Sequence, residues 1–289
     1  MLHCYAAFAI LQTLDNTNVK GTGEIEMKKI SERKRIVIKV GTSTLTHRTG
    51  MLNIRRVERL VKTLADLHNA GYEVILVSSG AIGLGMSKIG IQERPKDTPG
   101  KQACAAVGQC ELMNLYDNLF SEYSVTVAQL LLTKYVLLED RRKNVENAME
   151  RLISLGVIPI INENDTVAID ELELEVGEND SLAAIVANLA KADLLIIMSD
   201  IDGLYDEDPH KNPAAHLIPV VHEIDESVRA LAGGAVTRLG TGGMVTKLNA
   251  VEIAYDAGID VVLMNGKHPK RLYDLFADKQ VGTLFCKNN

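Results

Sequence analysis

The residues best suited to chemistry in this sequence are lysines that stand close to glycines where apolar segments end. Lys39 lies within the apolar segment 35–40, and Gly41 follows two positions later. An unpaired ammonium group is costly to bury, so two interpretations are open. Lys39 is an edge residue whose amine reaches water, or it is a cation aimed at a phosphate above Gly41, where the missing side chain lets a ligand approach the backbone.

A second glycine-rich segment, residues 240–247, has the sequence GTGGMVTK and leads into a predicted helix. It is not a Walker A motif, because its lysine comes late and no Ser or Thr follows. Three glycines before a helix still expose backbone N–H groups that can hold an anion. Lys247 stands about one turn into that helix, and we therefore favour a phosphate-binding role over that of a flexible linker.

Polar residues follow three other apolar segments and also open one predicted helix. SSGAIG at 78–83 fits either a tight turn with a serine N-cap or an anion site at a helix N-terminus. NEND at 162–165 can recognise an amino group or orient a lysine. GEND at 177–180 supplies an Asn or Asp N-cap, which can coexist with ligand contact, and SD at 199–200 begins either a turn or a nucleotide-facing loop.

The elements that position these segments alternate along the chain. Apolar runs predict buried strands, and apolar stripes of helical spacing that stop at glycine predict helices. The expected strands are 35–40, 72–80, 124–132, 157–165, 192–200 and 259–266, and the expected helices are 53–70, 101–122, 139–155, 180–191 and 243–257. This alternation predicts an α/β fold with a mainly parallel sheet covered on both faces. Ligands of such sheets bind beyond the carboxyl ends of the strands, where all six segments lie.

Composition excludes several classes of function. The chain of 289 residues has a formal charge of −7 and no Trp, which argues against nucleic-acid binding. An anionic substrate must then be met by a local group of lysines. No apolar run reaches the ~18 residues of a membrane span. The four cysteines show no zinc spacing and are expected to be free thiols in a reducing cytosol. There is no G-x-S-x-G element, and the G-x-G at 83–85 lacks the third glycine of a dinucleotide site.

The quoted segments, with KQACAAVGQ, QLLLT and the closing VGTLF, occur in the same order in the glutamate 5-kinases of the amino-acid-kinase superfamily, which this chain resembles over roughly residues 35–285. The resemblance implies a three-layer αβα sandwich. We expect residues 1–30 to be an N-terminal extension outside the fold and residues 31–289 to be the amino-acid-kinase domain. The chain ends soon after VGTLF, so it resembles the short form without a C-terminal PUA domain.

The resemblance also implies an activity, namely the ATP-dependent phosphorylation of the γ-carboxylate of L-glutamate, which is the first step of proline biosynthesis. The implied catalytic residues are Lys39, Lys247 and Asp165, of which Asp165 either orients a lysine or holds the substrate ammonium group. The implied glutamate-binding residues are Ser79, Gly80, Asp165 and Asn179. The implied nucleotide-binding residues are Lys39, Gly41, Ser199, Asp200, Thr241, Gly242, Gly243, Met244, Val245, Thr246 and Lys247. The family often has Thr in place of Ser199, and both residues keep a hydroxyl group.

A carboxylate nucleophile is ionised near neutral pH, so this chemistry needs no general base. Phosphoryl transfer then depends on alignment and charge neutralisation, for which the two lysines are the candidates. Magnesium is expected on ATP oxygens and waters, with no metal site made by the protein alone.

Two alternatives stay open at this stage. One is a related kinase that acts on a different carboxylate, carbamate or phosphate. The other is a non-catalytic nucleotide- or anion-binding protein, although the presence of both lysines argues against it. The resemblance further implies a cytoplasmic homo-oligomer, a dimer or tetramer, with proline as a feedback inhibitor.

Overall fold

The computed structural model describes residues 29–47, 49–133, 139–167, 179–232 and 243–287. Residues 1–28 lie outside this set, so the expected N-terminal extension stays a prediction. Ile30 packs against the core, and the Ser31 hydroxyl donates a hydrogen bond of 2.6 Å to Asp278. None of the described helices is both long enough and apolar enough to cross a membrane.

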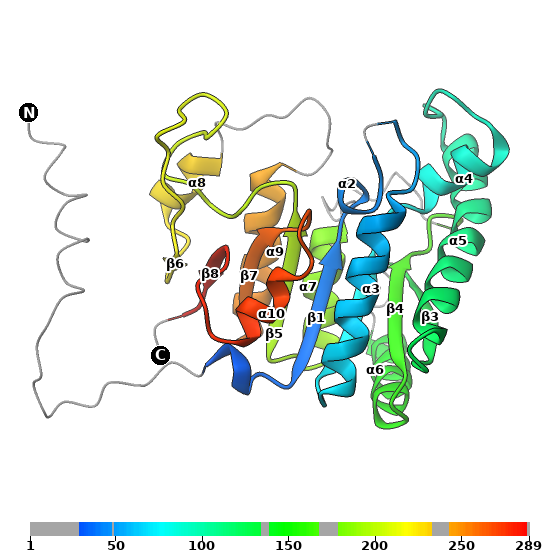
Figure 1. Cartoon of the computed structure of the whole chain (residues 1–289), viewed down its shortest axis with the longest axis horizontal. Coiled ribbons are helices and arrows are strands. Elements are labelled where there is room, and N and C mark those ends of the chain that lie inside the picture. Colours follow the sequence, from blue (N-terminus) through cyan, green and yellow to red (C-terminus); the bar gives the residue numbers. More distant parts are fainter. Residues whose placement is uncertain (1–28, 48, 134–138, 168–178, 233–242, 288–289) are drawn as a thin grey trace, which may run out of the picture.

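The centre of the fold is one sheet, to which the described residues contribute eight strands in the order β3-β4-β2-β1-β5-β7-β8-β6 (Figure 1). Neighbouring strands are parallel except β7 and β8. The strands are β1 (Arg35–Val40), β2 (Glu73–Ser78), β3 (Val127–Leu132), β4 (Ile158–Glu163), β5 (Leu194–Ser199), β6 (Val220–Val221), β7 (Asp260–Asn265) and β8 (Thr283–Phe285). The carboxyl ends of β1, β2, β4, β5 and β7 therefore meet at one edge of the sheet.

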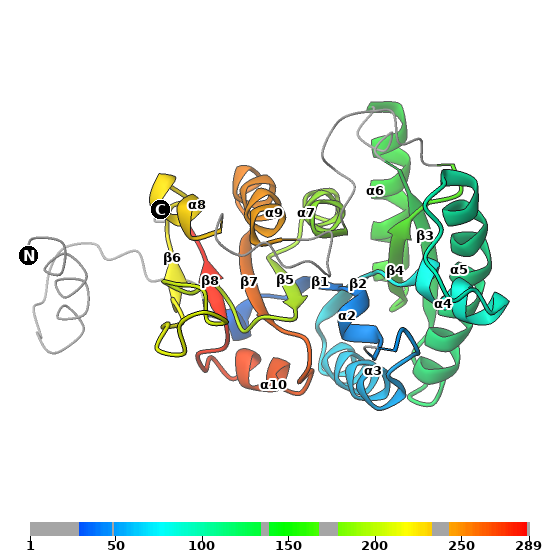
Figure 2. The same cartoon turned by 90° about the horizontal axis from the view of Figure 1, so that it is seen from above.

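Helices cover both faces of this sheet (Figure 2), as the sequence predicted. The helices are η1 (Ile30–Glu32), α2 (Thr42–Leu45), α3 (Ile54–Asn69), α4 (Ala81–Ile89), α5 (Thr98–Ser121), α6 (Glu139–Ser154), α7 (Asn179–Leu189), α8 (Glu226–Ala232), α9 (Met244–Asp256) and α10 (Arg271–Phe276). Side chains of α3, α5 and α10 share one apolar cluster. Side chains of α6, α7 and α9 share the other. The predicted three-layer αβα sandwich is confirmed.

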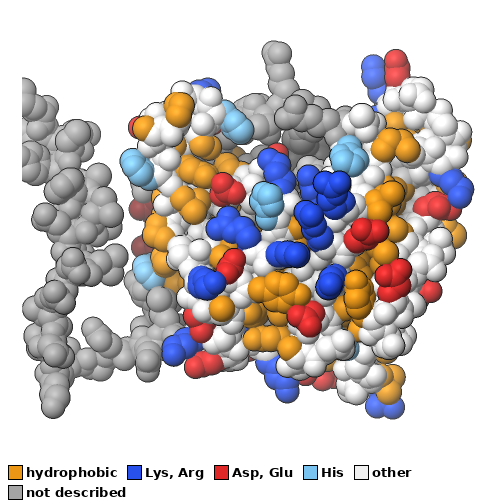
Figure 3. Space-filling view, in the orientation of Figure 1, with side chains coloured by type: hydrophobic (Ala, Val, Ile, Leu, Met, Phe, Trp, Pro, Cys, Tyr) orange, Lys and Arg blue, Asp and Glu red, His pale blue; other side chains and the backbone are white. Residues whose placement is uncertain are grey.

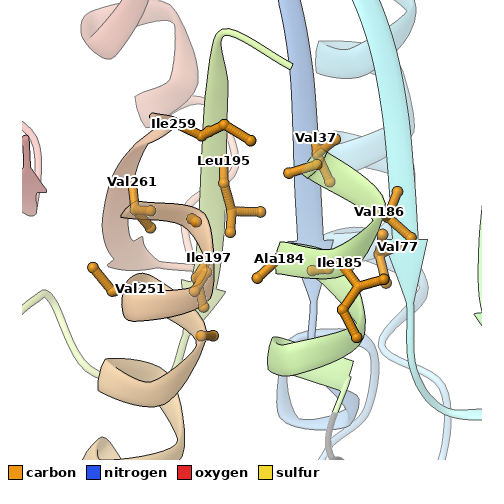
Figure 4. Close-up of a cluster of buried hydrophobic side chains, with 14 of the residues drawn as sticks. Val37, Val77, Ala184, Ile185, Val186, Leu195, Ile197, Val251, Ile259 and Val261 are labelled. Carbon is orange, nitrogen blue, oxygen red and sulfur yellow. The ribbon is translucent and has the colours of Figure 1, made fainter. Parts of the chain in front are cut away.

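The alternation of side chains along β1 decides which way Lys39 points. Ile36 and Ile38 belong to the α3 cluster, whereas Val37 belongs to the cluster with α7 and α9. Figure 4 shows Val37 among the side chains that lie between β1 and α7. Successive side chains of a strand point to opposite faces, so Lys39, two residues after Val37, is directed toward α7 and α9.

Each strand predicted from the sequence is present, with ends one to three residues inside the expected limits where they differ. The sequence analysis missed the short elements α2, α8, α10, β6 and β8, which offer too few residues for a periodic pattern. It also missed α4, because its sequence AIGLGMSKI contains two glycines, and glycine disfavours helix.

The glycines of α4 are explained by its contact with α5. A Cβ atom on Gly108 of α5 would lie 1.7 Å from the carbonyl oxygen of Ala81, and one on Gly85 would lie 1.8 Å from that of Cys104. The two backbones thus approach too closely for any side chain between them. This contact fixes the start of α4, and with it the Ser79–Gly80 turn, against the rest of the fold.

We predict that Gly108→Ala lowers the free energy of unfolding by at least the ~1–3 kcal/mol typical of overpacking, because the two helices must separate. Urea unfolding measures the effect. Gly83→Ala in α4 is the matched control, since no atom lies within 4 Å of its added Cβ, and it should be neutral or stabilising by up to about 1 kcal/mol. Similar losses in both variants would contradict this account of the helix contact.

Candidate active site

The segments singled out from the sequence lie side by side along the carboxyl edge of the sheet. Val40, the last residue of β1, pairs with Ser78 on one side and with Met198 on the other. The next strand after β2 is β4, and the next strand after β5 is β7. Ser199, the last residue of β5, pairs with Asn265, the last residue of β7. The Lys39–Gly41 segment therefore occupies the middle of the edge.

Lys39 and Lys247 meet at a single carboxylate, that of Asp180. The Lys39 Nζ lies 2.7 Å from one carboxylate oxygen and the Lys247 Nζ lies 3.2 Å from the other. The side chains of Lys39, Asp180 and Lys247 are only 10, 2 and 9% exposed. Three elements that are distant in sequence, β1, α7 and α9, are thus joined by one buried ionic cluster.

The charge of this cluster favours an anion beside it. Burial by itself raises the pKa of Asp180, but the adjacent ammonium groups of Lys39 and Lys247 outweigh burial and lower it, so the carboxylate stays ionised. Two ammonium groups and one carboxylate leave a net charge of +1 in a nearly dry position. A Cβ on Gly41 would lie 3.3 Å from the Lys39 Nζ, so glycine here keeps the approach to that ammonium group open.

The predicted phosphate loop is described only from Gly243 onward. Thr241 and Gly242 lie outside the described residues. Gly243 is the N-cap of α9, Met244 is buried and Val245 is 48% exposed. The Thr246 hydroxyl donates to the Gly243 carbonyl oxygen at 2.7 Å, so it closes the first turn of the helix that carries Lys247.

On the β2 and β4 side of Lys39, an amide network centres on Asn179, the first residue of α7. Its Nδ2 lies 2.7 Å from the Ser79 hydroxyl, 3.2 Å from the Ser78 carbonyl oxygen and 3.1 Å from Asn162 Oδ1. Asn162 in turn donates to Gln109 Oε1 at 2.9 Å. Ser79 and Asn179, both predicted to bind the substrate, are therefore in direct contact.

The turn at Gly80 depends on its lack of a side chain. Gly80 is the N-cap of α4 and adopts φ +104°, in the left-handed region that favours glycine. Ser78, two residues before Gly80, is fully buried, and its hydroxyl lies 2.9 Å from the Tyr116 hydroxyl. This arrangement fixes the backbone that presents Ser79 to the edge of the sheet.

Asp165 follows β4, and the carboxylate that holds both lysines belongs instead to Asp180. Burial raises the pKa of Asp165, and the charge of Arg94 only partly opposes that rise. A nearby cation would therefore stabilise the ionised form of this partly buried carboxylate.

The β5 and β7 side of Lys39 presents hydroxyl, amide and carboxylate groups. The Ser199 hydroxyl donates to Asp200 Oδ1 at 3.1 Å, and the backbone N–H of Gly266 donates to the Ser199 carbonyl oxygen at 2.7 Å. Asn265 Nδ2 donates to Asp202 Oδ1 at 2.8 Å. Asp200 is exposed at the surface of the edge.

Sequence reasoning missed the roles of Asp180 and Gln109. It treated Asp180 as a candidate helix cap. The residues after it in α7 are almost all buried, and an acid that begins so apolar a helix needs a nearby cation, which was the available signal. Gln109 lies in the KQACAAVGQ segment, but its contact with Asn162 depends on how α5 packs and has no local signature.

The described residues contain no group of three or more His, Cys, Asp or Glu side chains placed to hold a metal ion. Both oxygens of Asp180 face ammonium groups. A divalent cation at this site would therefore need most of its oxygen ligands from a bound phosphate compound and from water.

Comparison with known proteins gives a consistent picture. A model of the amino acid kinase family matches residues 34–265. The glutamate 5-kinase of Clostridium acetobutylicum is 51% identical over 91% of this chain and 98% of its own length, and that of Clostridium perfringens is 49% identical over 89% and 97%. The glutamate 5-kinase of Caldanaerobacter subterraneus is 50% identical over 87% of this chain but only 67% of its own length.

Solved structures of lower similarity share the fold. The isopentenyl phosphate kinase of T. acidophilum superposes with a TM-score of 0.60 at 19% identity, over 87% of this chain and 100% of that chain. The carbamate kinase of Giardia lamblia, bound to AMP-PNP, gives a TM-score of 0.61 at 18% identity, over 89% and 100%.

We predict that Asp180→Asn costs about 3–5 kcal/mol of the free energy of unfolding at neutral pH, because it leaves two buried ammonium groups without their counter-charge. The folded-state pKa of Asp180 is lowered, so its contribution is fully present above the ordinary aspartate pKa and is lost as the pH falls through the lowered value. Urea unfolding of both proteins from neutral to acidic pH should show their difference shrinking. A difference that is constant with pH would contradict the assignment.

Proposed function

Because the chain belongs to the glutamate 5-kinases of the amino acid kinase family, we propose that it transfers the γ-phosphoryl group of ATP to the γ-carboxylate of L-glutamate. The product is L-glutamyl 5-phosphate, and the reaction is the first step of proline biosynthesis. The family assignment and the fold, both expected from the sequence, are confirmed.

The observation that carries the proposal for the site is the position of the buried lysine pair. Lys39 and Lys247 converge on Asp180 in the middle of the edge. The amide network of Ser79, Asn179 and Asn162 lies on one side, and the ends of β5 and β7 lie on the other. A phosphoryl group in transit between an acceptor on the first side and a nucleotide on the second would pass the two ammonium groups.

The two lysines act by neutralising charge. The γ-carboxylate of glutamate is already ionised near neutral pH, so no side chain needs to remove a proton. Both the nucleophile and the transferred group are anionic, and their approach is opposed unless cations lie close by. Lys39 and Lys247, held in place by Asp180, supply that charge from fixed positions, so little reorganisation is needed during transfer.

Glutamate recognition is proposed for the β2 and β4 side. The Ser79 hydroxyl and the Asn179 amide face this side, with Gly80 setting the backbone that carries Ser79. For Asp165, of the two roles expected from the sequence, we propose that it holds the substrate ammonium group. Asp180 already orients the lysines, and a partly buried carboxylate such as Asp165 is stabilised by a cation.

ATP binding is proposed for the β5 and β7 side. Ser199 and Asp200 would face the nucleotide, and Gly41 with the segment Thr241–Lys247 would surround its phosphates. Bound magnesium would supply charge neutralisation on the phosphate oxygens. The residues present are compatible with magnesium on ATP. Both carboxylate oxygens of Asp180 are paired with lysines, so Asp180 does not compete with ATP for the ion.

The finer points of the resemblance remain part of this proposal. They are proline as a feedback inhibitor, a dimer or tetramer, and a cytoplasmic location. Cys104, Cys110 and Cys286 form no disulfide within the described residues, which is compatible with a reducing compartment. Sedimentation would measure the oligomeric state, and a proline titration of the activity would measure feedback inhibition.

The decisive experiment is ATP turnover with magnesium and a panel of acceptors: L-glutamate, N-acetylglutamate, aspartate, carbamate and UMP. Hydroxylamine is added to trap the acyl phosphate. We expect ADP release with glutamate alone, together with γ-glutamyl hydroxamate. Turnover with another acceptor only would keep the kinase and overturn the substrate, and nucleotide binding without any turnover would favour a non-catalytic binding protein.

We predict that Lys247→Ala lowers kcat by about 100-fold or more, as loss of one charge-stabilising group does elsewhere, while the KM for glutamate changes little. Steady-state kinetics over both substrates measure it. Lys143→Ala is the control, since Lys143 is exposed on α6, and it should resemble wild type. Equal losses in kcat and in glutamate affinity, or no loss, would be incompatible with the role given to Lys247.

We predict that kcat/KM for glutamate falls as the pH drops through a pKa higher than that of an ordinary aspartate, because only ionised Asp165 holds the ammonium group and burial raises its pKa. Asp165→Asn should raise the KM for glutamate and remove this part of the pH profile, while the titration of the substrate carboxylate remains. A profile unchanged by Asp165→Asn would remove Asp165 from glutamate recognition.

A further inference from the structure

A second basic site lies on the opposite face of the sheet from the lysine cluster. A cavity of about 420 Å³ opens beside the start of α3. It is lined by His47, Leu52, Asn53, Ile54, Arg55, Arg56, Arg59 and Lys267, none of which belongs to the lysine cluster or to the amide network. Figure 3 shows Lys and Arg side chains gathered over the middle of the face that α2, α3 and α10 cover.

The charge of this cavity is unbalanced. Among the described residues its lining contains three arginines, a lysine and a histidine but no Asp or Glu, although the whole chain carries −7. Arg55 and Arg59 are exposed at the cavity, and their side chains make no hydrogen bond or ion pair within the described part of the chain. Their guanidinium groups are free to meet a ligand.

Arg56 is already oriented. Its Nη1 donates to the carbonyl oxygens of Ser43 at 2.8 Å and Thr44 at 3.2 Å, which fixes the guanidinium between α3 and α2. Within the described residues its Nε and Nη2 have no partner. A guanidinium whose position is fixed in advance loses less freedom on binding and suits the bidentate recognition of phosphate oxygens.

The position of the arginines runs against local helix preference. All three stand in the first two turns of α3, whose first turn contains no acidic residue. The N-terminus of a helix carries partial positive charge and favours anions, so three cations there repel it and one another. A polyanion in the cavity would relieve both repulsions, and departures from local preference of this kind are typical of functional sites.

We propose that this cavity is a binding site for a small polyanion that carries two or more phosphate groups. Its volume matches the range for small-molecule sites, about 300–1,000 Å³, and its concave shape suits a compact ligand better than a flat protein surface. Arg55 and Arg59 meet the phosphate oxygens, with Arg56 at the base. The site goes beyond the proposed function, and its detection needs no turnover.

The test is isothermal titration of the full chain with sodium pyrophosphate while Mg²⁺, AMP-PNP and glutamate saturate the active site, with saturation checked by a separate AMP-PNP titration. We expect one further site per chain in wild type. Arg55→Glu/Arg59→Glu should weaken pyrophosphate binding by about tenfold or more, since it replaces two charge-assisted donors by like charges, while kcat and both KM values without pyrophosphate stay unchanged.

The matched control is Lys143→Glu/Arg151→Glu, which makes the same change in net charge at two exposed positions of α6 on the other face. It should bind pyrophosphate within about twofold of wild type, because exposed charges that distant are screened. If Arg55→Glu/Arg59→Glu is unstable in thermal melts, Arg55→Gln/Arg59→Gln takes its place, and we then expect a smaller loss of pyrophosphate affinity. Absence of binding once the active site is filled, or equal weakening in the α6 control, would overturn the proposal.

Discussion

The ionic cluster of Lys39, Asp180 and Lys247 is the interaction on which the arrangement of the site depends. Its three members come from β1, α7 and α9, so a single carboxylate fixes the sheet and two helices relative to one another. Buried ion pairs contribute little net stability, because desolvation offsets their attraction, but loss of one partner is severe. The cluster is therefore better understood as a positioning device: it holds two ammonium groups at fixed places while leaving a charge of +1 for an anion.

The start of α7 joins the two halves of the site through two consecutive residues. Asn179 faces the amide network at the ends of β2 and β4. Asp180 faces the lysines. Side chains one position apart on a helix point about 100° away from each other, so one helical turn can serve acceptor recognition and phosphate neutralisation at once. A movement of α7 would therefore disturb the amide network and the lysine cluster together, which would link the two roles proposed for them.

Much of this could be read from the sequence, because the strand ends are marked by local patterns. Lys39, Ser79 and Asn179 were found beside apolar runs, and their meeting at one edge follows from parallel topology. The pairing of Asp180 with both lysines could not be found in the same way, since it depends on how α7 and α9 pack over β1. Gln109 was missed for the same reason, and α4 because the glycines that allow its contact with α5 also weaken the helical signal.

An acidic chain that binds anionic substrates needs its positive charge in the right places. Net charge acts over long range, but at physiological salt its influence fades beyond about 8 Å. What a ligand meets at the carboxyl edge is the local balance: a buried +1 cluster on the α7 and α9 face, and an arginine-lined cavity without carboxylates on the α3 face. The two lie on either side of α2, and Arg56 hydrogen-bonds the backbone of that helix. An anion held at the cavity would therefore also restrain the segment that follows Gly41, next to Lys39, for which phosphate binding is proposed.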